Sequence, residues 1–225
     1  MKFTLAQEHI DHFNKTGAIE FYDLFSEKEC QTLLNHADSI LTQRVNPTPR
    51  NPLHLASNEN LYLNGKNLWK DGFETKKLCL KKQLADIAFH LFRKKHIRLA
   101  FDQYVRTGTL QDCPFKDNLT IQDISSIRPT IGGVFILLED YPFSFENPLI
   151  PKKAGNVIFA ADNVLLPLKE LFTEKNVFML MIGFSSGKPL YCLEMNDPHT
   201  HSLKKDGIVF GDSAGEDLCP TLLMN

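Results

Sequence analysis

The side chains whose types and spacing best suit metal chemistry lie in the stretch MNDPHTHSL. Asp197, His199 and His201 occupy alternate positions, so in an extended chain their side chains project to one face. A carboxylate and two imidazoles on one face lie within reach of a single metal ion. The run Asn196-Asp197-Pro198 is also typical of a solvated turn, which is the alternative interpretation of this stretch.

A second group of candidate residues is basic. Apolar positions between residues 75 and 96 recur at helical spacing, which predicts one long helix whose lysines mostly face outward. Such a face could neutralise a nucleic-acid backbone. A solvated helix face is the alternative, because the formal net charge of -2 creates no attractive field and neither helix-turn-helix spacing nor an aromatic platform accompanies the lysines. The lysines concerned are Lys76, Lys77, Lys81, Lys82, Lys94 and Lys95.

The composition predicts a single domain over residues 1–225. Hydrophobic residues make up 43% and charged residues 23% of the chain, as in ordinary globular domains. The five cysteines form no C-x-x-C pair, which excludes a zinc-finger spacing and favours a reducing, cytoplasmic compartment. The longest apolar run, VFMLMIGF, is far shorter than the ~20 residues of a membrane span. We therefore expect neither a signal peptide nor a membrane partner.

The first 96 residues are predicted to be rich in helix. AIEFYDLF (18–25) has the composition of a short strand, and Ser26 and Glu29 then have capping-box spacing, which marks a helix start. Apolar residues recur at helical spacing as far as Leu41. The proline-rich stretch from Arg44 to Asn60 predicts a long surface loop or lid.

From residue 97 the apolar period changes to two, which predicts strands. Short β-rich segments separated by Gly, Pro, Asn and Asp are typical of a sandwich or barrel. The expected fold class is α+β and mainly β, with a jelly-roll core over residues 97–225 and the helix-rich residues 1–96 packed on it. The predicted strands cover residues 97–106, 133–139, 156–161, 176–184, 189–195 and 207–213.

Three stretches, taken in order, carry a resemblance to a known family. They are FNKTGAIEFYDLFSEKECQTLLNHADSIL, LAFDQYVRTG, and IQDISSIRPTIGGVFILLED followed by NPLIPKKAGNVIFAADNVLLPL. They resemble the entry strand and helix, the strand before the metal motif, and the metal strand of the Fe(II)/2-oxoglutarate-dependent oxygenases, in their phytanoyl-CoA dioxygenase branch. This resemblance covers most of the chain and implies a double-stranded β-helix. The chain also resembles a small chlamydial protein group, in which a divalent-cation-dependent regulator has been proposed.

The chain departs from that family at the metal motif. The family uses His-x-Asp and a distal histidine to hold Fe(II), leaving positions open for 2-oxoglutarate and oxygen. Here the motif reads Ile121-Gln122-Asp123, so only the acidic position is kept. The distal histidine should follow NVIFAADN, where the chain has Leu165 and Leu166. Two of the three ligands are therefore missing.

The co-substrate position is also altered. The resemblance places a basic residue near NVFMLMIGF, and no Arg or Lys occurs between residues 176 and 186. Arg106 is a candidate for a vestigial anion-binding residue, and a structural cap at a strand end is its alternative role.

Three functions follow from these observations. The first is a non-catalytic or cryptic member of the oxygenase fold, which binds a small molecule or protein and for which no cofactor is expected. The second is an active Fe(II)/2-oxoglutarate oxygenase with non-standard ligands, in which His199 or His201 joins Asp123. The third is a metal-responsive regulator that binds DNA through the lysines named above.

Overall fold

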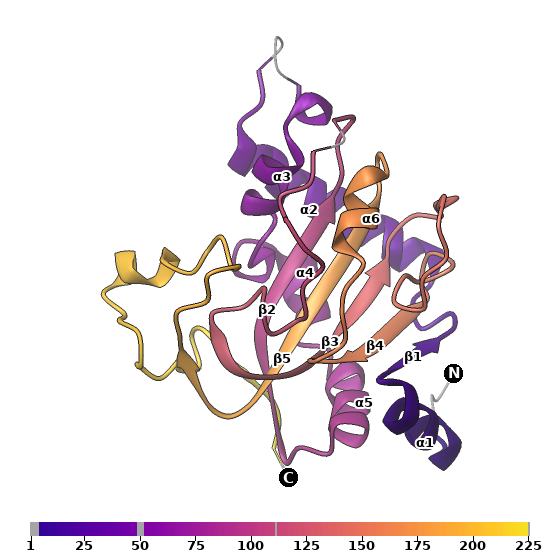
Figure 1. Cartoon of the computed structure of the whole chain (residues 1–225), viewed down its shortest axis with the longest axis vertical. Coiled ribbons are helices and arrows are strands. Elements are labelled where there is room, and N and C mark those ends of the chain that lie inside the picture. The colour runs from indigo at the N-terminus through magenta and orange to yellow at the C-terminus, as the bar shows by residue number, and fades with distance from the viewer. Residues whose placement is uncertain (1–4, 49–51, 111, 225) are drawn as a thin grey trace.

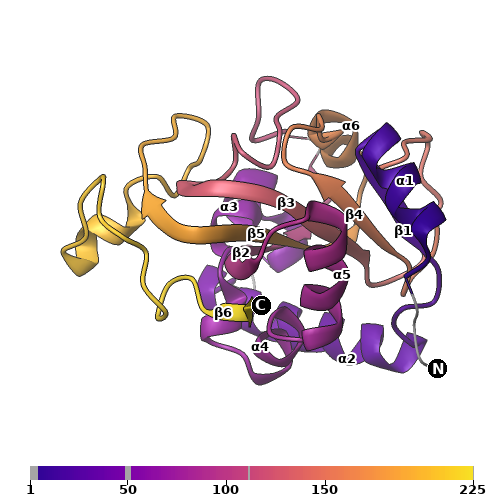
Figure 2. The same cartoon turned by 90° about the horizontal axis from the view of Figure 1, so that it is seen from below.

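A computed structural model describes residues 5–48, 52–110 and 112–224. Its centre is an antiparallel sheet in the order β1-β4-β3-β5-β2-β6, strongly curled in Figures 1 and 2. The longest strands, β3, β5 and β2, lie in the middle of the sheet. The strands are β1 (Ala18–Phe21), β2 (His96–Arg106), β3 (Ile127–Leu137), β4 (Val157–Ala161), β5 (Phe178–Tyr191) and β6 (Thr221–Met224).

Most of the helices cover one face of this sheet. Figure 2 shows α2, α4 and α5 on one side and α6 on the other. No helix in the described residues is long and apolar enough to cross a membrane. The helices are α1 (Gln7–Thr16), α2 (Glu27–Val45), α3 (Asn58–Asn64), α4 (Phe73–Cys79), α5 (Lys82–Phe92) and α6 (Leu168–Thr173), with 3-10 turns at Leu53–Leu55, Leu68–Lys70 and Ser202–Asp206.

Helix α2 begins where the sequence predicts. The Ser26 hydroxyl accepts a hydrogen bond from the Glu29 backbone N–H at 3.3 Å, and the Glu29 carboxylate accepts one from the Ser26 N–H at 2.9 Å. These two bonds satisfy N–H groups that have no partner within the helix. The apolar stripe from Cys30 to Leu41 is buried. The prediction for this helix is confirmed.

Two helical predictions are corrected. The expected loop from Arg44 to Asn60 is shorter, because Arg44 still belongs to α2 and α3 begins at Asn58, where the Ser57 side chain caps it. The long helix expected over residues 75–96 is two helices, α4 and α5, separated at Leu80 and Lys81. On either side of this break, α4 and α5 each bury apolar side chains in the same core.

Two strand predictions are also corrected. The segment 189–195 is not a separate strand, because β5 continues without interruption to Tyr191. The segment 207–213 forms no regular strand, and only Ser213 pairs there, in an isolated bridge with Leu190. Turn-forming residues on both sides of that apolar stretch leave it too short to pair along its length. The α+β class itself is confirmed by the sheet and its helix layer.

The sheet separates two apolar cores. One core lies under the helices, and the second lies on the opposite face, beneath α6 and irregular segments. On that opposite face the described residues form no second regular sheet, and Thr120 pairs with Leu165 in an isolated antiparallel bridge.

A shift in the register of β2 decides which side chains reach which core. The pairing of β2 with β5 shifts between Leu99 and Phe101. Leu99 therefore packs in the helix-side core, whereas Phe101 and Val105 pack in the second core. Because strand side chains alternate, the even-numbered residues that follow the shift face the helices.

Candidate functional site

The two segments that resemble the oxygenase metal strands lie next to each other, as the isolated bridge between Thr120 and Leu165 shows. Ile121 is only 2% exposed and packs in the second core, and Leu166 is buried in the same core. Leu165 points outward and is 63% exposed. Where the resemblance assigns two imidazoles, the chain therefore has apolar side chains.

Asp123 caps its own turn. Its carboxylate oxygen Oδ2 accepts hydrogen bonds from the backbone N–H and the hydroxyl of Thr120, both at 2.8 Å. The Asp123 N–H in turn donates to the Thr120 carbonyl at 3.1 Å. This is the pattern in which an aspartate stabilises a tight turn, so these contacts account for the residue without a ligand.

Arg106 lies on the helix side of the sheet. Its guanidinium forms an ion pair with Asp38 of α2, with 2.6 Å between Nη1 and Oδ2, and lies over the ring of Phe178. The other oxygen of Asp38 accepts a hydrogen bond from the Tyr104 hydroxyl at 2.7 Å. Because Arg106 and Tyr104 follow the register shift in β2, both are directed towards α2 and away from the second core. Arg106 thus fastens α2 to the strand.

Asp197, His199 and His201 are only partly brought together. Asp197 is 2% exposed, and its Oδ1 accepts a hydrogen bond from the backbone N–H of His199 at 2.9 Å. The Nε2 atom of His199 is buried and has no hydrogen-bond partner among the described residues. His201 is exposed beside the ring of Phe210.

A buried lysine holds Asp197. The Lys66 Nζ lies 2.7 Å from Asp197 Oδ1, and it also donates to the Ile124 carbonyl at 3.2 Å. The second oxygen of Asp197 accepts hydrogen bonds from the backbone N–H and the hydroxyl of Ser126, each at 2.8 Å. Both carboxylate oxygens are therefore occupied, and the negative charge is neutralised inside the protein.

Strand β2 positions Lys66 through its neighbours. Lys66 pairs with Gln103 in an isolated bridge, and the Asp102 carboxylate accepts the backbone N–H groups of Leu68 at 2.9 Å and Trp69 at 3.1 Å. Burial raises the pKa of Asp102 to about 7, and these two N–H donors oppose that rise. The segment after α3 is thereby held along the strand, with Lys66 directed to Asp197.

Charge and burial also set the pKa of His199. Burial, together with the positive charge of Lys66, lowers this pKa to about 4, and the negative charge of Asp197 opposes the shift. The same ion pair keeps the pKa of Asp197 below its usual value, although burial alone would raise it. Near neutral pH the cluster therefore contains Asp197 as a carboxylate and His199 as a neutral imidazole.

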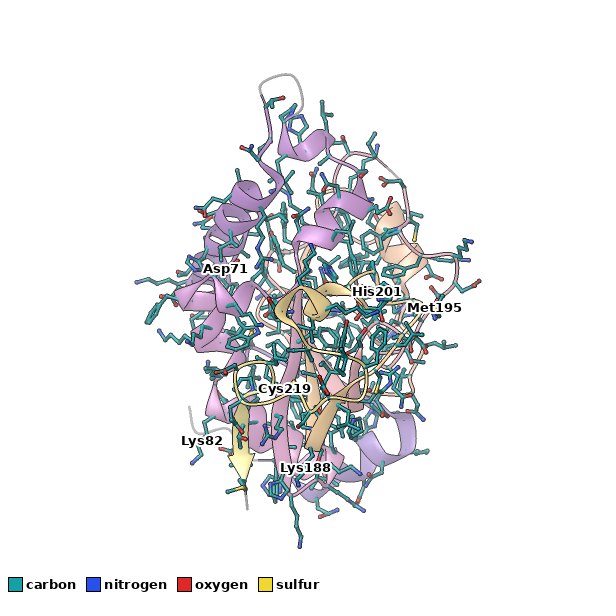
Figure 3. All side chains as sticks on the ribbon, turned by 90° about the vertical axis from the view of Figure 1, so that its left-hand side faces the viewer. Asp71, Lys82, Lys188, Met195, His201 and Cys219 are labelled. Atoms are coloured by element: carbon teal, nitrogen blue, oxygen red, sulfur yellow. The ribbon has the colours of Figure 1, made fainter. Side chains whose placement is uncertain are left out.

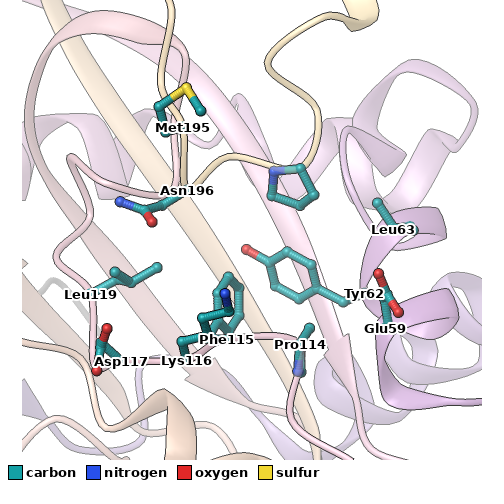
Figure 4. Close-up of a pocket in the computed structure, with 11 residues that line it drawn as sticks. Glu59, Tyr62, Leu63, Pro114, Phe115, Lys116, Asp117, Leu119, Met195 and Asn196 are labelled. Atoms are coloured by element: carbon teal, nitrogen blue, oxygen red, sulfur yellow. The ribbon is translucent and has the colours of Figure 1, made fainter.

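The turn that carries Asp197 also forms one wall of a cavity of about 330 Å³, drawn in Figure 4. Tyr62 and Phe115 form its aromatic part, with ring centroids 5.0 Å apart and nearly perpendicular rings. Met195 and Asn196 close another side, and Met195 is 81% exposed. Figure 4 shows the Tyr62 hydroxyl directed into the space between these walls.

The six lysines do not share one face of a single helix. Lys76 and Lys77 belong to α4, Lys82 begins α5, and Lys81 lies at the break between them. Lys77 forms an ion pair with a glutamate of its own helix. Lys81 lies 3.6 Å from a carboxylate oxygen of α2 and over a phenylalanine ring. Lys94 and Lys95 follow α5 in exposed positions. Nucleic-acid binding through them stays a prediction.

Comparison with solved structures establishes the fold. The carbocyclase SnoK, an alpha-ketoglutarate-dependent non-heme protein from nogalamycin biosynthesis, superposes with a TM-score of 0.67 at 14% identity, over 97% of this chain and 96% of that chain. The epimerase SnoN from the same biosynthesis gives a TM-score of 0.68 at 12% identity, over 96% and 98%. This chain has the fold of the Fe(II)/2-oxoglutarate oxygenases. No family model matches it, and no curated protein is similar in sequence.

The chlamydial resemblance has a structural counterpart of lower similarity. CT296 from Chlamydia trachomatis matches with a TM-score of 0.48 at 15% identity, over 83% of this chain and 99% of that chain. A TM-score of this size supports no conclusion about function.

The side chains that the structure describes do not form the ligand set of an Fe(II) centre. Within the parts of the chain that the structure describes, no group of three or more His, Cys, Asp or Glu side chains could hold a metal ion. Asp123 is bonded to Thr120, and Asp197 is neutralised by Lys66. An iron site with two histidines and a carboxylate needs three such ligands on one face of the metal.

Lys66 and Ser126 were not found from the sequence. They lie 131 and 71 residues from Asp197, and neither belongs to a motif with a characteristic spacing. A lysine in a polar turn such as NGKN reads as an exposed residue. Only the folded chain shows that it is buried.

We expect Asp197→Asn to destabilise the protein strongly. The substitution leaves the Lys66 ammonium buried without its counter-charge, which should lower the free energy of unfolding by about 3–5 kcal/mol in urea denaturation at pH 7. The paired change Lys66→Met/Asp197→Leu removes both charges and should recover most of that loss. As a control, Glu74→Gln breaks the exposed pair with Lys77 and should cost less than about 1 kcal/mol. A loss for Asp197→Asn as small as that of the control would contradict this account.

A second prediction concerns pH. Between about pH 6.5 and pH 4, His199 is neutral in the folded chain but protonated in the unfolded chain. The unfolded state then binds the extra proton, so stability should fall by about 2–3 kcal/mol as the pH falls through this window. His199→Asn should remove that part of the pH dependence, measured by urea denaturation at several pH values. His201→Asn, at an exposed histidine, should retain it; equal pH profiles for the two variants would refute the assignment.

Proposed function

We propose that this protein is a non-catalytic member of the Fe(II)/2-oxoglutarate oxygenase fold and acts by binding. The observation that carries the proposal is the apolar packing at the metal position, where Ile121 and Leu166 are buried in the second core. A polar or metal-bound group there would have to displace well-packed apolar side chains. The finer assignments, to the double-stranded β-helix and to the phytanoyl-CoA branch, rest on the sequence resemblance.

The co-substrate position supports the same proposal. The first part of β5 is buried and apolar, with Met179, Met181 and Ile182 within it. Arg106 is paired with Asp38 on the other face of the sheet. Neither the strand nor the arginine offers a free positive charge to a dicarboxylate on the side of the second core.

We assign the ligand site to the cavity of Figure 4. Its aromatic walls suit a flat apolar molecule, and the Tyr62 hydroxyl and the Asn196 amide suit one oxygen-containing substituent. Glu59, Lys116 and Asp117 lie on its border and give no strong positive charge. The ligand class is therefore a small neutral aromatic molecule with a hydroxyl or carbonyl group. The five free cysteines support placing the protein in a reducing compartment such as the cytoplasm.

Anaerobic Fe(II) titration in the presence of 2-oxoglutarate tests the proposal that the protein is non-catalytic. We expect no saturable iron binding to the unmodified chain and no succinate formation. Asp123→Ala and His199→Ala/His201→Ala serve as comparison variants and should behave like the unmodified chain. One tightly held iron per chain, lost in either variant, would overturn the proposal and favour an active oxygenase with non-standard ligands.

Calorimetric titration with 2-naphthol tests the cavity. We expect saturable binding, weakened by about tenfold or more in Phe115→Ala, because this change removes half of the aromatic wall. Phe143→Ala is the matched control, since Phe143 stacks on Tyr141 in a different loop. Circular dichroism should show that both variants are folded. Equal affinities for the two variants, or no saturable binding to the unmodified chain, would place the ligand site elsewhere.

A further inference from the structure

A second cavity, of about 730 Å³, is lined by residues of α1 and α5, the start of β3, the end of β4 and part of β5. It shares no lining residue with the cavity of Figure 4. In Figure 3, Lys188, which borders this second cavity, lies towards the lower end of the molecule, whereas Met195 of the first cavity lies higher, on the C-terminal segment. The two cavities are therefore separate.

One wall of the second cavity is apolar. Phe13 of α1 and Phe92 of α5 stack edge to face, with ring centroids 5.6 Å apart. Leu91 and Ile131 extend this wall. Such a surface suits an alkyl chain or an aromatic ring, because both gain by leaving water against it.

Polar and positively charged side chains also line this cavity. Lys94 and Lys188 border the cavity, and neither forms an ion pair within the described part of the chain. The carboxylate of Asp162 supplies one negative charge. It accepts a hydrogen bond from the side-chain amide of Gln122 at 3.0 Å. Two lysines against one carboxylate leave one positive charge for a ligand to neutralise.

Thr130 adds an independent polar feature. It lines the same cavity and is 3% exposed, and its Oγ1 has no hydrogen-bond partner among the described residues. A buried hydroxyl without a partner is costly, and a ligand oxygen would satisfy it.

We propose that this cavity binds an amphipathic carboxylate, with the carboxylate between Lys94 and Lys188 and the apolar part against Phe13 and Phe92. The residual charge favours a monoanion, and the apolar wall favours a hydrocarbon chain or ring over a small polar acid. This site is distinct from the oxygenase metal position, since Ile121 is buried in the second core while its neighbour Gln122 is exposed and lines this cavity.

Calorimetric titration of the full chain with octanoate tests the proposal, and 1-octanol serves as the uncharged probe. We expect saturable octanoate binding and much weaker binding of 1-octanol. Lys94→Ala/Lys188→Ala should weaken octanoate binding by about tenfold or more, because two charge-assisted contacts are lost. Both lysines are exposed, so the variant should fold. Lys175→Ala/Lys205→Ala, at two exposed lysines outside the cavity, is the matched control and should bind as the unmodified chain does.

A blocking variant locates the site. Ser186 lines the cavity and is half-buried, and Ser186→Trp should fill part of the cavity and abolish octanoate binding while the 2-naphthol titration is unchanged. Absence of saturable octanoate binding to the unmodified chain would overturn the proposal. So would equal affinity in the two double-lysine variants, equal binding of 1-octanol, or full octanoate binding to Ser186→Trp.

Discussion

The buried ion pair between Lys66 and Asp197 joins three parts of the chain that are distant in sequence. Lys66 follows α3, Ser126 precedes β3, and Asp197 belongs to the segment after β5. Removing two charges from water is expensive. Part of that cost is offset by the hydrogen bonds that Ser126 donates to Asp197 and by the one that Lys66 donates to the Ile124 carbonyl. The charges and hydrogen bonds of Lys66 and Asp197 are satisfied only when these segments lie together. The pair therefore fixes the turn that forms one wall of the cavity of Figure 4. The ion pair therefore stabilises one position of the segment after β5 over others.

This chain has the oxygenase fold, and the positions to which the sequence resemblance assigns histidines carry apolar side chains. The sheet is stabilised by its backbone pairing and by two apolar cores, and neither requires a metal. Ile121 and Leu166, in the two segments that resemble the metal strands, add buried apolar side chains to the second core. A shared fold carries no activity by itself, and the binding sites of this chain depend on its own side chains.

The register shift in β2 has a comparable influence on the other face. It directs Tyr104 and Arg106 to Asp38 of α2, and it places Asp102 where it accepts the N–H groups of the segment that carries Lys66. One irregularity in a central strand thus organises both the helix layer and the buried cluster. Without the shift, alternation would send these polar side chains into the opposite, apolar core.

The sequence by itself determined the features that depend on near neighbours. The capping residues Ser26 and Glu29, the apolar stripe of α2 and most strands could be predicted because their signals lie within a few residues of one another. The resemblance also predicted, from sequence, that histidines are absent at Ile121 and at Leu165 and Leu166. Tertiary structure alone decided the break between α4 and α5, the orientation of Arg106, and the pairing of Asp197 with Lys66. These features depend on contacts between distant residues, and a local pattern contains no information about which distant partner will be buried beside it.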